Sequence, residues 1–410
     1  MRVTPLRGWR YRGGEEHDLT KVVAPPYDQI SAETRDRLAA MSPHNIVRVT
    51  LPEDDPAVDK YVRAGQLLDA WVADGVWAAD GEPAIYPYQQ TYTGGGATVT
   101  RRGFIALGEV SDYKDGVVRP HERTHAGPKR DRLRLLEATR ADVGVLFMLV
   151  SDPGGELLGL TAPRGEPCAE ARDLKGELHR LWRITDPATI ARAQALMAPR
   201  SVIIADGHHR YETAVEYARR HPGVSDKLMA FCALEAAGLT ILANHRLVHG
   251  IPGFSLDTLA RAAAPSFDIA PLANPLASEP DNRAIGVVAA DRALVFRLRD
   301  TAVDRLPWPR GTSPAWRHLA VSILHEALLK PWLGITDDLL DAGTHVDYTA
   351  DRAEAVTLVR AGRYQAAFLI APTTAEELRT VVEGGELLPQ KSTHFYPKLL
   401  DGLVFHRLGR

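Results

Sequence analysis

Five consecutive residues, Asp206-Gly207-His208-His209-Arg210, place a carboxylate, a glycine and three basic side chains next to one another. The β-branched run at 201–205 predicts a buried strand before them, and the spacing of 211–220 predicts a helix after them. Gly207 permits a tight turn, and the first amides of a helix have no partners within it. Basic side chains at the positive end of a helix are unfavourable unless an anion lies between them. The segment therefore predicts an anion-binding turn, with phosphate as the expected anion.

The same residues also have a simpler interpretation. A single histidine is more often packed or solvated, and Asp206 can serve only as a helix cap. Three basic side chains at one helix start favour the anion site over that interpretation. Adjacent histidines do not readily face one ion from a regular helix, and no His-x-x-x-His spacing accompanies them. The sequence therefore argues against a histidine metal centre.

Residues 119–132 form the densest mixed-charge stretch of the chain. His121 and Glu122 are side chains suited to proton transfer, whereas Lys129, Arg130 and Arg132 are suited to binding anions. The alternative for this stretch is a solvated loop that leads into the first turn of a helix.

Residues 388–398 gather polar groups between two prolines near the C-terminus. Lys391, Ser392, Thr393 and Lys398 are typical of an anion-binding loop, although the glycines of a Walker sequence are missing. The alternative is a polar connection anchored by an aromatic residue.

Two pairs of residues are further candidates for contacts with a substrate. Tyr27 and Asp28 end a proline-containing turn, for which a purely structural role is the main alternative. His245 and Arg246 stand at the end of an expected strand, where side chains often point into a site.

A chain of 410 residues is too long for one ordinary core, so two or three packed units are expected. We place a boundary near residue 250, in a segment with two glycines and a proline, which gives domains 1–250 and 251–410. Mixed strand-like and helix-like segments predict an α/β fold. Helices are expected at 31–41, 61–72, 131–139, 186–197, 211–220, 316–333, 356–361 and 374–382. Strands are expected at 46–49, 143–150, 201–205, 284–289, 293–298 and 366–370, with hairpins at 84–107 and 231–243.

Composition narrows the class of protein. The hydrophobic fraction of 45% and the charged fraction of 25% are those of a globular chain. A net charge of -3 gives no reason to expect nucleic acid or an anionic membrane as the main partner. The N-terminus lacks the apolar core of a signal peptide, the longest apolar runs are too short to span a bilayer, and only two cysteines are present. We therefore expect a cytoplasmic protein.

No G-x-G-x-x-G follows a strand and no G-x-S-x-G occurs, so Rossmann and α/β-hydrolase sites are not supported.

Six segments, in order along the chain, carry a family resemblance. They are Ala24-Pro25-Pro26-Tyr27-Asp28, His44-Asn45-Ile46, Pro120-His121-Glu122, 205–213, His245-Arg246 and 389–398. Together they resemble the bacterial and archaeal family called domain of unknown function 1015, from about residue 5 to the C-terminus. The chain departs from the family at Ala243-Asn244, where Pro-Thr is more usual, and at Leu388, where Met is more usual. The departures put the local geometry of the strand end in question rather than membership.

Asp206-Gly207-His208-His209-Arg210 is also similar to the Asp-Gly-x-His-Arg element of free serine kinases in the ParB/sulfiredoxin superfamily. The similarity implies a ParB/sulfiredoxin-like fold for residues 1–250, followed by a smaller α/β domain. It also implies that the turn holds the phosphates of ATP or ADP on Gly207 and the amides that follow. His208, His209 and Arg210 then neutralise developing charge, and Asp206 is the expected ligand of Mg²⁺.

The same resemblance implies a group that removes the proton from an attacking hydroxyl. Glu122 is the candidate, with His121 beside it, because both lie in a segment shared with the family. Lys391 or Lys398 is expected to close over the substrate. The resulting hypothesis is a nucleotide-dependent phosphotransferase that acts on a small hydroxyl metabolite, with free serine as the first candidate.

Two other functions stay open at this point. A phosphatase acting on a phosphorylated metabolite would use the same anion site, with His208 or His209 as the phosphorylated intermediate. A non-catalytic nucleotide-sensing protein is the third possibility. The sequence shows no basic recognition helix for nucleic acid and does not indicate an oligomeric state.

Overall fold

The computed structural model describes residues 1–12, 18–124, 126–277 and 281–408. Within this part, the chain forms two compact units, one of Met1–Thr240 with Pro397–Arg410 and one of Ile241–Tyr396. The boundary expected near residue 250 lies a few residues beyond Thr240, after which the chain first leaves the first unit for the second. The return of the last residues to the first unit was not expected, because no local pattern in them indicates the sheet on which they pack.

Nine strands of the described residues form the central sheet of the first unit, which makes this unit a mixed α/β fold, as expected. The β6/β11 and β8/β12 pairs are parallel and the other pairs are antiparallel. The order is β6 (Val118–Arg119), β11 (Val202–Asp206), β8 (Leu146–Val150), β12 (Asp226–Ala233), β5 (Ala97–Glu109), β4 (Tyr86–Gly94), β10 (Leu178–Leu181) and β9 (Ala169–Arg172), with β1 (Val3–Thr4) beside β5.

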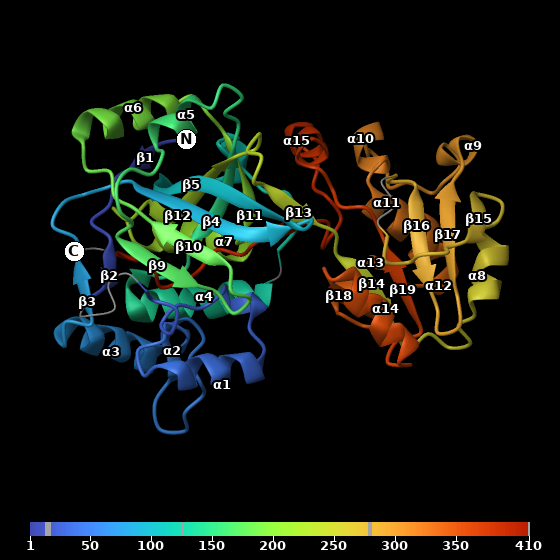
Figure 1. The fold of residues 1–410 in the computed structure, drawn as a ribbon, viewed down its shortest axis with the longest axis horizontal. Helices are drawn as coiled ribbons and strands as arrows, with labels where there is room; N and C mark the ends of the chain where they lie inside the picture. The colour runs from blue at the N-terminus through green and yellow to red at the C-terminus, as the bar shows by residue number, and fades with distance from the viewer. Residues whose placement is uncertain (13–17, 125, 278–280, 409–410) are drawn as a thin grey trace. The chain divides into compact units, whose positions relative to one another are not determined.

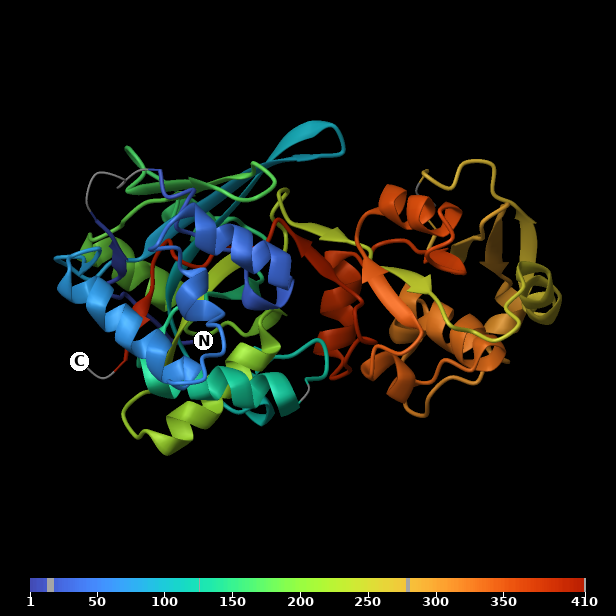
Figure 2. The ribbon, with the colours of Figure 1, turned by 90° about the horizontal axis from the view of Figure 1, so that it is seen from below.

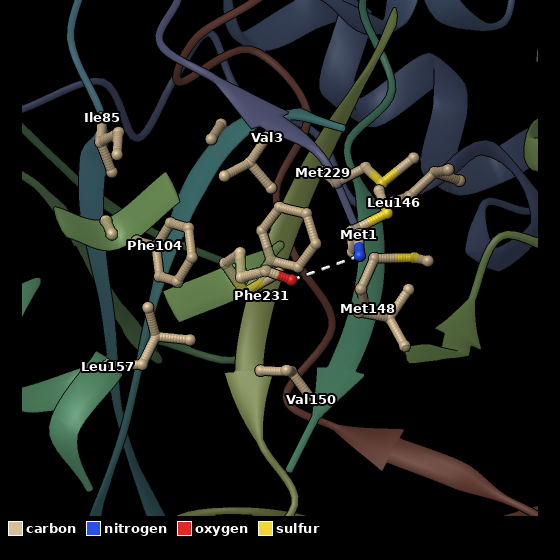
Figure 3. Close-up of a cluster of buried hydrophobic side chains, with 14 of the residues drawn as sticks. Met1, Val3, Ile85, Phe104, Leu146, Met148, Val150, Leu157, Met229 and Phe231 are labelled. Carbon is tan, nitrogen blue, oxygen red and sulfur yellow. Dashed lines mark hydrogen bonds between the residues drawn. The ribbon is translucent and has the colours of Figure 1, made fainter. Parts of the chain in front are cut away.

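Helices cover both faces of this sheet. Figures 1 and 2 show α5 (Glu156–Leu160) and α6 (Pro187–Met197) on one side, with α3 (Lys60–Ala73) and α4 (Ala126–Thr139) on the other. Helix α7 (His208–Arg220) packs against α4, which also packs against α3. The main core lies between the sheet and α6, and Figure 3 shows Phe104, Met148 and Phe231 within it. The smaller elements of the unit are α1 (Ala32–Met41), α2 (Val47–Thr50), β2 (Trp9–Tyr11), β3 (Trp77–Ala79), and the single turns Tyr27–Gln29 and Tyr113–Asp115.

The returning C-terminal segment is tied to the first unit by backbone pairing. Asp401 bridges Ala24, Phe405 bridges Trp9, and β21 (His406–Arg407) pairs with β7 (Ala141–Asp142). Asp401 donates its amide to the carbonyl of Ala24 at 2.9 Å. This segment therefore carries residues from the end of the chain into the interior of the first unit.

The second unit is built on a six-stranded antiparallel sheet. Its order is β15 (Phe267–Pro271), β17 (Ala293–Leu298), β16 (Ala284–Val288), β19 (Ala366–Leu369), β14 (His245–Val248) and β18 (Val346–Thr349). Helix α14 (Arg352–Arg360) packs on β14 and β19 around Val356, Val359 and Leu247. The other helices are α8 (Leu256–Ala263), α9 (Asp300–Val303), α10 (Pro314–Arg317), α11 (Ala320–Leu324), α12 (Lys330–Leu333), α13 (Asp337–Asp341) and α15 (Ala375–Glu383), and β13 (Thr240–Leu242) pairs with β20 (His394–Tyr396).

Three expected elements are wrong. Residues 47–49 lie in α2 rather than in a strand, and Ile46 precedes this helix, because the side chain of Asn45 accepts the amide of Val47 and starts a helical turn. The 231–243 hairpin does not form, since β12 pairs with β5 and β8 while β13 pairs with β20. The long helix at 316–333 is divided by a π-helical turn, His325–Leu329, just before Pro331. Proline has no amide to donate to the preceding turn, and a π turn accommodates that loss.

Among the described residues, no helix combines the length and the apolar character needed to cross a membrane.

Candidate active site

The turn between β11 and α7 is the feature that the sequence singled out. The pairing of β11 with β8 shifts register between Ile204 and Asp206, and the chain then turns at Gly207 with φ at +101°. A Cβ built on Gly207 would lie 2.6 Å from Cδ2 of the fully buried Leu146 and 3.1 Å from Nε of Arg210. Only glycine fits here. No side chain of the described residues caps α7, so its first amides are free of a competing cap.

Asp206 holds two cations beside this turn. Lys398 Nζ donates to Asp206 Oδ2 at 2.8 Å, and Arg210 NH2 lies 3.5 Å from Asp206 Oδ1. Burial alone would raise the pKa of Asp206, but Lys398 and Arg210 outweigh it and hold this pKa well below its usual range. Asp206 is therefore ionised at neutral pH, and it faces Lys398 and Arg210 rather than an open position for a metal ion. Its expected role as a Mg²⁺ ligand does not fit these contacts.

Lys398 is fixed through its own backbone. Gln90 Nε2 donates to the Lys398 carbonyl at 2.8 Å, and the buried Arg101 donates to the carbonyl of Pro397. Lys398 thus reaches Asp206 from a segment that two polar side chains of the sheet hold in place.

His208 is buried, and both of its ring nitrogens face other residues. Nε2 accepts the backbone amide of His121 at 3.2 Å, and Nδ1 lies 3.2 Å from Oε1 of Glu122. Since Nε2 is an acceptor, a neutral His208 carries its proton on Nδ1, next to the carboxylate. His208 therefore joins the 121–122 segment to the start of α7, and its expected role in phosphate binding is not supported by this geometry.

His121 is equally enclosed. Its Nδ1 lies 2.6 Å from the carbonyl of Ile204, and burial lowers its pKa to about 4, so it is neutral at physiological pH. His121, Glu122 and His208 gather possible ligand atoms within 4.8 Å of one another. A metal ion at this group would have to replace the proton on His208 Nδ1, because Nε2 of the same ring accepts the amide of His121.

Replacing His208 with alanine should lower the free energy of unfolding by about 1–3 kcal/mol, since the buried amide of His121 would lose its acceptor. The exposed His221, at the other end of α7, is the matched control: its ring only stacks on Tyr217, so its replacement should lower stability by less than about 1 kcal/mol. Urea unfolding measures both. Equal stability of the two variants would contradict the structural role of His208.

His209 and the turn at Tyr27 complete the predicted residues of the first unit. His209 is half-buried, and its carbonyl accepts the hydroxyl of Thr213 at 2.8 Å. The guanidinium of Arg132 lies 4.0 Å from the centre of the Tyr27 ring, and Asp28 is exposed. Tyr27 is thus packed under a cation, which gives it a structural contact in addition to the predicted substrate contact.

The remaining predicted residues lie in the second unit, where His245 and Arg246 are buried. His245 Nδ1 accepts the amide of Ile370 at 3.3 Å, and burial lowers its pKa to about 3. Arg246 is 0% exposed and donates to the carbonyls of Gln390 and Lys391 at 3.1 and 3.2 Å. These two side chains hold backbone in place, so their expected contact with a substrate is not supported.

The 391–393 loop is held by the same contacts. Asn244 Nδ2 donates to the carbonyls of Lys391 and Thr393, each at 3.1 Å, and the hydroxyl of the buried Ser392 donates to the carbonyl of Pro389. Lys391 is exposed and has φ at +57°, which is uncommon for a residue with a side chain. The loop therefore presents Lys391 on a constrained backbone, while the hydroxyl of Ser392 is engaged internally.

A cavity of about 520 Å³ lies against α4 and the later turns of α7. Most of its charged groups pair with one another, as shown by Lys129 with Glu212 at 2.8 Å and Arg219 with Asp112 at 2.6 Å, and the exposed Arg130 also lines it. The cavity has the size of a ligand site, and the basic side chains that are already paired are less available to phosphate.

Sequence reasoning missed residues that lie around Arg210. Thr50, Gly144 and Asp401 line a small cavity with it, and no motif marks them. The one local pattern is that Asp401 precedes a glycine with φ at +102°, which repeats the Asp-Gly pair at 206–207.

Comparisons with known proteins find solved structures of low sequence identity and low structural similarity. No curated protein matches the chain. A conserved hypothetical protein from Pyrococcus furiosus has 12% identity and a TM-score of 0.39, with 72% of this chain and 93% of that chain covered. Free serine kinase in complex with AMP has 12% identity and a TM-score of 0.39, with 71% and 86% covered. C-terminally truncated SbnI from Staphylococcus aureus has 11% identity and a TM-score of 0.38, with 72% and 85% covered.

A protein-family model also matches the chain. The model of the family described as protein of unknown function DUF1015 matches residues 3–322, which include the β11–α7 turn and end before the 389–398 loop. The match spans most of the sequence, and the chain belongs to the DUF1015 family.

Proposed function

We propose that the chain binds a nucleotide by its phosphates at the start of α7 and transfers a phosphoryl group to a small hydroxyl compound. The observation that carries the proposal is the Gly207 turn, where Leu146 and Arg210 leave no room for a side chain and the first amides of a 13-residue helix have no side-chain cap. Such a turn binds phosphate oxygens through backbone amides. The similarity of 206–210 to free serine kinases supports a nucleotide as the source of the phosphate and a ParB/sulfiredoxin-like fold for the first unit.

Positive charge for the transfer comes from Arg210 and Lys398. Both are held by Asp206, so their positions are fixed before a nucleotide arrives. Phosphoryl transfer needs positioning and charge neutralisation more than covalent chemistry from the protein. Asp206 acts here by orienting the two cations, and no step is assigned to a metal ion on this carboxylate.

The phosphatase alternative would need a histidine that can carry a phosphoryl group. The ring nitrogens of His208 face His121 and Glu122, which leaves this histidine poorly suited to a phosphorylated intermediate. Nothing in the geometry favours the nucleotide-sensing alternative over transfer.

The direct test gives purified protein a magnesium salt, ATP or ADP, and a panel of hydroxy amino acids and hydroxy acids. Phosphorus NMR should detect a phosphorylated product. Inorganic phosphate released from phosphoserine without nucleotide would identify a phosphatase instead. Nucleotide-dependent dimerisation without turnover would identify a sensor. If no nucleotide binds and no product forms, the proposal is wrong.

Replacing Lys398 with methionine should weaken ADP binding about 10-fold, the effect of losing roughly 1.5 kcal/mol of a charge-assisted contact. The exposed Lys114 provides the control, because its replacement removes the same charge away from Asp206. Calorimetric titration with ADP measures the affinities, and circular dichroism checks that both variants fold. An unchanged affinity in folded Lys398→Met would remove Lys398 from the site.

A further inference from the structure

A second site is suggested by a cavity of about 50 Å³ inside the first unit. Arg210, Thr50, Gly144 and Asp401 line it, together with the ring of Tyr27. One water needs roughly 10–15 Å³ of such space, so the cavity has room for a few heavy atoms.

Three residues that line this cavity each carry a buried polar atom with no hydrogen-bond partner in the part of the chain that the structure describes. These atoms are Oγ1 of Thr50, Nε of Arg210 and Oδ1 of Asp401. The three residues are 2%, 8% and 3% exposed, respectively. A buried polar atom without a partner costs about 1–3 kcal/mol, so three around one cavity indicate a missing polar occupant.

The neighbouring charges that line the cavity are already engaged. Lys227 pairs with Asp142 and donates to the carbonyl of Gly144 at 2.8 Å, and Arg132 pairs with Asp131. The atoms without a hydrogen-bond partner are therefore one N–H donor, one hydroxyl and one carboxylate oxygen. A complementary ligand carries an oxygen acceptor for Arg210 and a hydroxyl donor for Asp401.

Arg210 joins this cavity to the anion-binding turn. A Cβ on Gly207 would lie 3.1 Å from Arg210 Nε, and a Cβ on Gly144 would lie 3.3 Å from Arg210 Cδ and 3.9 Å from Asp401 Oδ1. The guanidinium is thus enclosed between two glycines, with the turn on one side and the Asp401 carboxylate on the other.

We propose that this cavity binds the acceptor of the transfer, a small hydroxy acid, and that Asp401 takes the proton from its attacking hydroxyl. The proposal rests on the proposed function for its chemical step. The acid's carboxylate accepts from Arg210 Nε and Thr50, and its hydroxyl donates to Asp401 Oδ1. As the hydroxyl oxygen bonds to the terminal phosphorus, the bond from phosphorus to the nucleotide's bridging oxygen breaks, that oxygen keeps the electron pair, and the proton moves to Asp401.

The chemistry of Asp401 agrees with this role. Burial raises its pKa to about 7, although Arg210, Lys227 and a hydrogen bond from the backbone of Val145 oppose the increase. A general base is most effective when its pKa is near the working pH. Glu122, the base expected from the sequence, faces His208 and does not line this cavity.

Binding of hydroxy acids tests the cavity without any turnover. Glycolate is compared with acetate, and L-serine with L-alanine, so that each pair differs only in the hydroxyl. The hydroxy compounds should bind at least 10-fold more tightly than their partners. Gly144→Ala should weaken their binding at least 10-fold by narrowing the cavity, whereas Gly159→Ala, where a Cβ meets nothing within 4 Å, should not. No preference for the hydroxyl, or equal binding by Gly144→Ala, overturns the proposal.

Turnover and nucleotide binding then separate this inference from the proposed function. Asp401→Asn should reduce kcat at least 100-fold, within the usual contribution of a general base, and leave ADP affinity unchanged. Hydroxy-acid binding that responds to Gly144→Ala, without any nucleotide binding, would keep the site and reject the proposed function. Full turnover by Asp401→Asn would keep the function and reject Asp401 as the base.

Discussion

Replacing Gly207 with alanine is expected to lower the free energy of unfolding by about 2–4 kcal/mol and to weaken nucleotide binding at least 100-fold. The residue has φ at +101°, a conformation that side chains strain, and its new Cβ would lie 2.6 Å from the fully buried Leu146. Relieving that contact must move Leu146 or the turn. Either movement displaces the first amides of α7 from the positions in which we propose that they bind phosphate.

Gly223 provides a matched control for this effect. Its φ is +97°, but a Cβ there meets nothing within 4 Å. Gly223→Ala should therefore show only the backbone strain, about 1 kcal/mol, and bind ADP normally. Urea unfolding and calorimetric titration compare the two variants. If Gly207→Ala matches Gly223→Ala in both measurements, the turn does not depend on close packing and the phosphate site is wrong.

The sequence predicted the parts of the fold that depend on local pattern. The β-branched run before Gly207 becomes β11, and the helix after it becomes α7. The side chain of Ser31 caps α1 by accepting the amide of Thr34, and the glycine-containing 84–107 segment becomes the β4/β5 hairpin. In each case the information lies within a few residues of the element.

The arrangement of the site depends on contacts that local pattern does not contain. Lys398 reaches Asp206 across 192 positions of sequence, and His208 turns away from the expected anion because a backbone amide of the 121–122 segment needs its lone pair. The strand, the turn and the helix could thus be predicted from sequence, but the partner of each basic side chain could not. Arg246 shows the same limit, since its role in holding the 390–391 carbonyls appears only when the second unit is folded.

The contacts of the three basic side chains at 208–210 show why their shared positive charge did not predict their individual roles. Three adjacent basic residues suggested a single anion between them, yet the structure sends Arg210 to Asp206 and places His208 beside Glu122. Arg210 contacts Asp206 beside the turn and also lines the small cavity. It therefore has more influence on the proposed chemistry than the two histidines that precede it.

Asp401→Asn is expected to stabilise the protein above neutral pH while it removes activity. Asp401 is 3% exposed, and burial raises its pKa to about 7 against the opposing charges of Arg210 and Lys227, with Asp28 adding to the increase. In the unfolded chain the same carboxyl has its ordinary pKa of about 3.9. At pH values between these two pKa values, Asp401 is protonated in the folded state and ionised in the unfolded chain.

The sign of the pH dependence follows from that difference. Because the folded state binds more protons between about pH 4 and 7, the contribution of Asp401 to the free energy of unfolding falls as pH rises through this window and stays low above it. About 1.4 kcal/mol per pH unit gives a loss on the order of 2–4 kcal/mol. An asparagine cannot ionise, so the stability of Asp401→Asn relative to the unaltered protein should increase from pH 4.5 to pH 8.

Asp80 provides the control of opposite sign. It is 2% exposed and is held by Arg10, Tyr86 and Arg183, which outweigh burial and keep its pKa below the usual value. Asp80 stabilises the folded state at pH values above the pKa that it has in the unfolded chain, and this stabilisation is lost only as pH falls through its lower folded-state pKa. Asp80→Asn should therefore destabilise the protein throughout pH 4.5–8. Urea unfolding at the two pH values distinguishes the variants. If Asp401→Asn is no more stable than the unaltered protein at pH 8, then the pKa of Asp401 is not raised in the folded state, which contradicts its proposed role as a base that works near neutral pH.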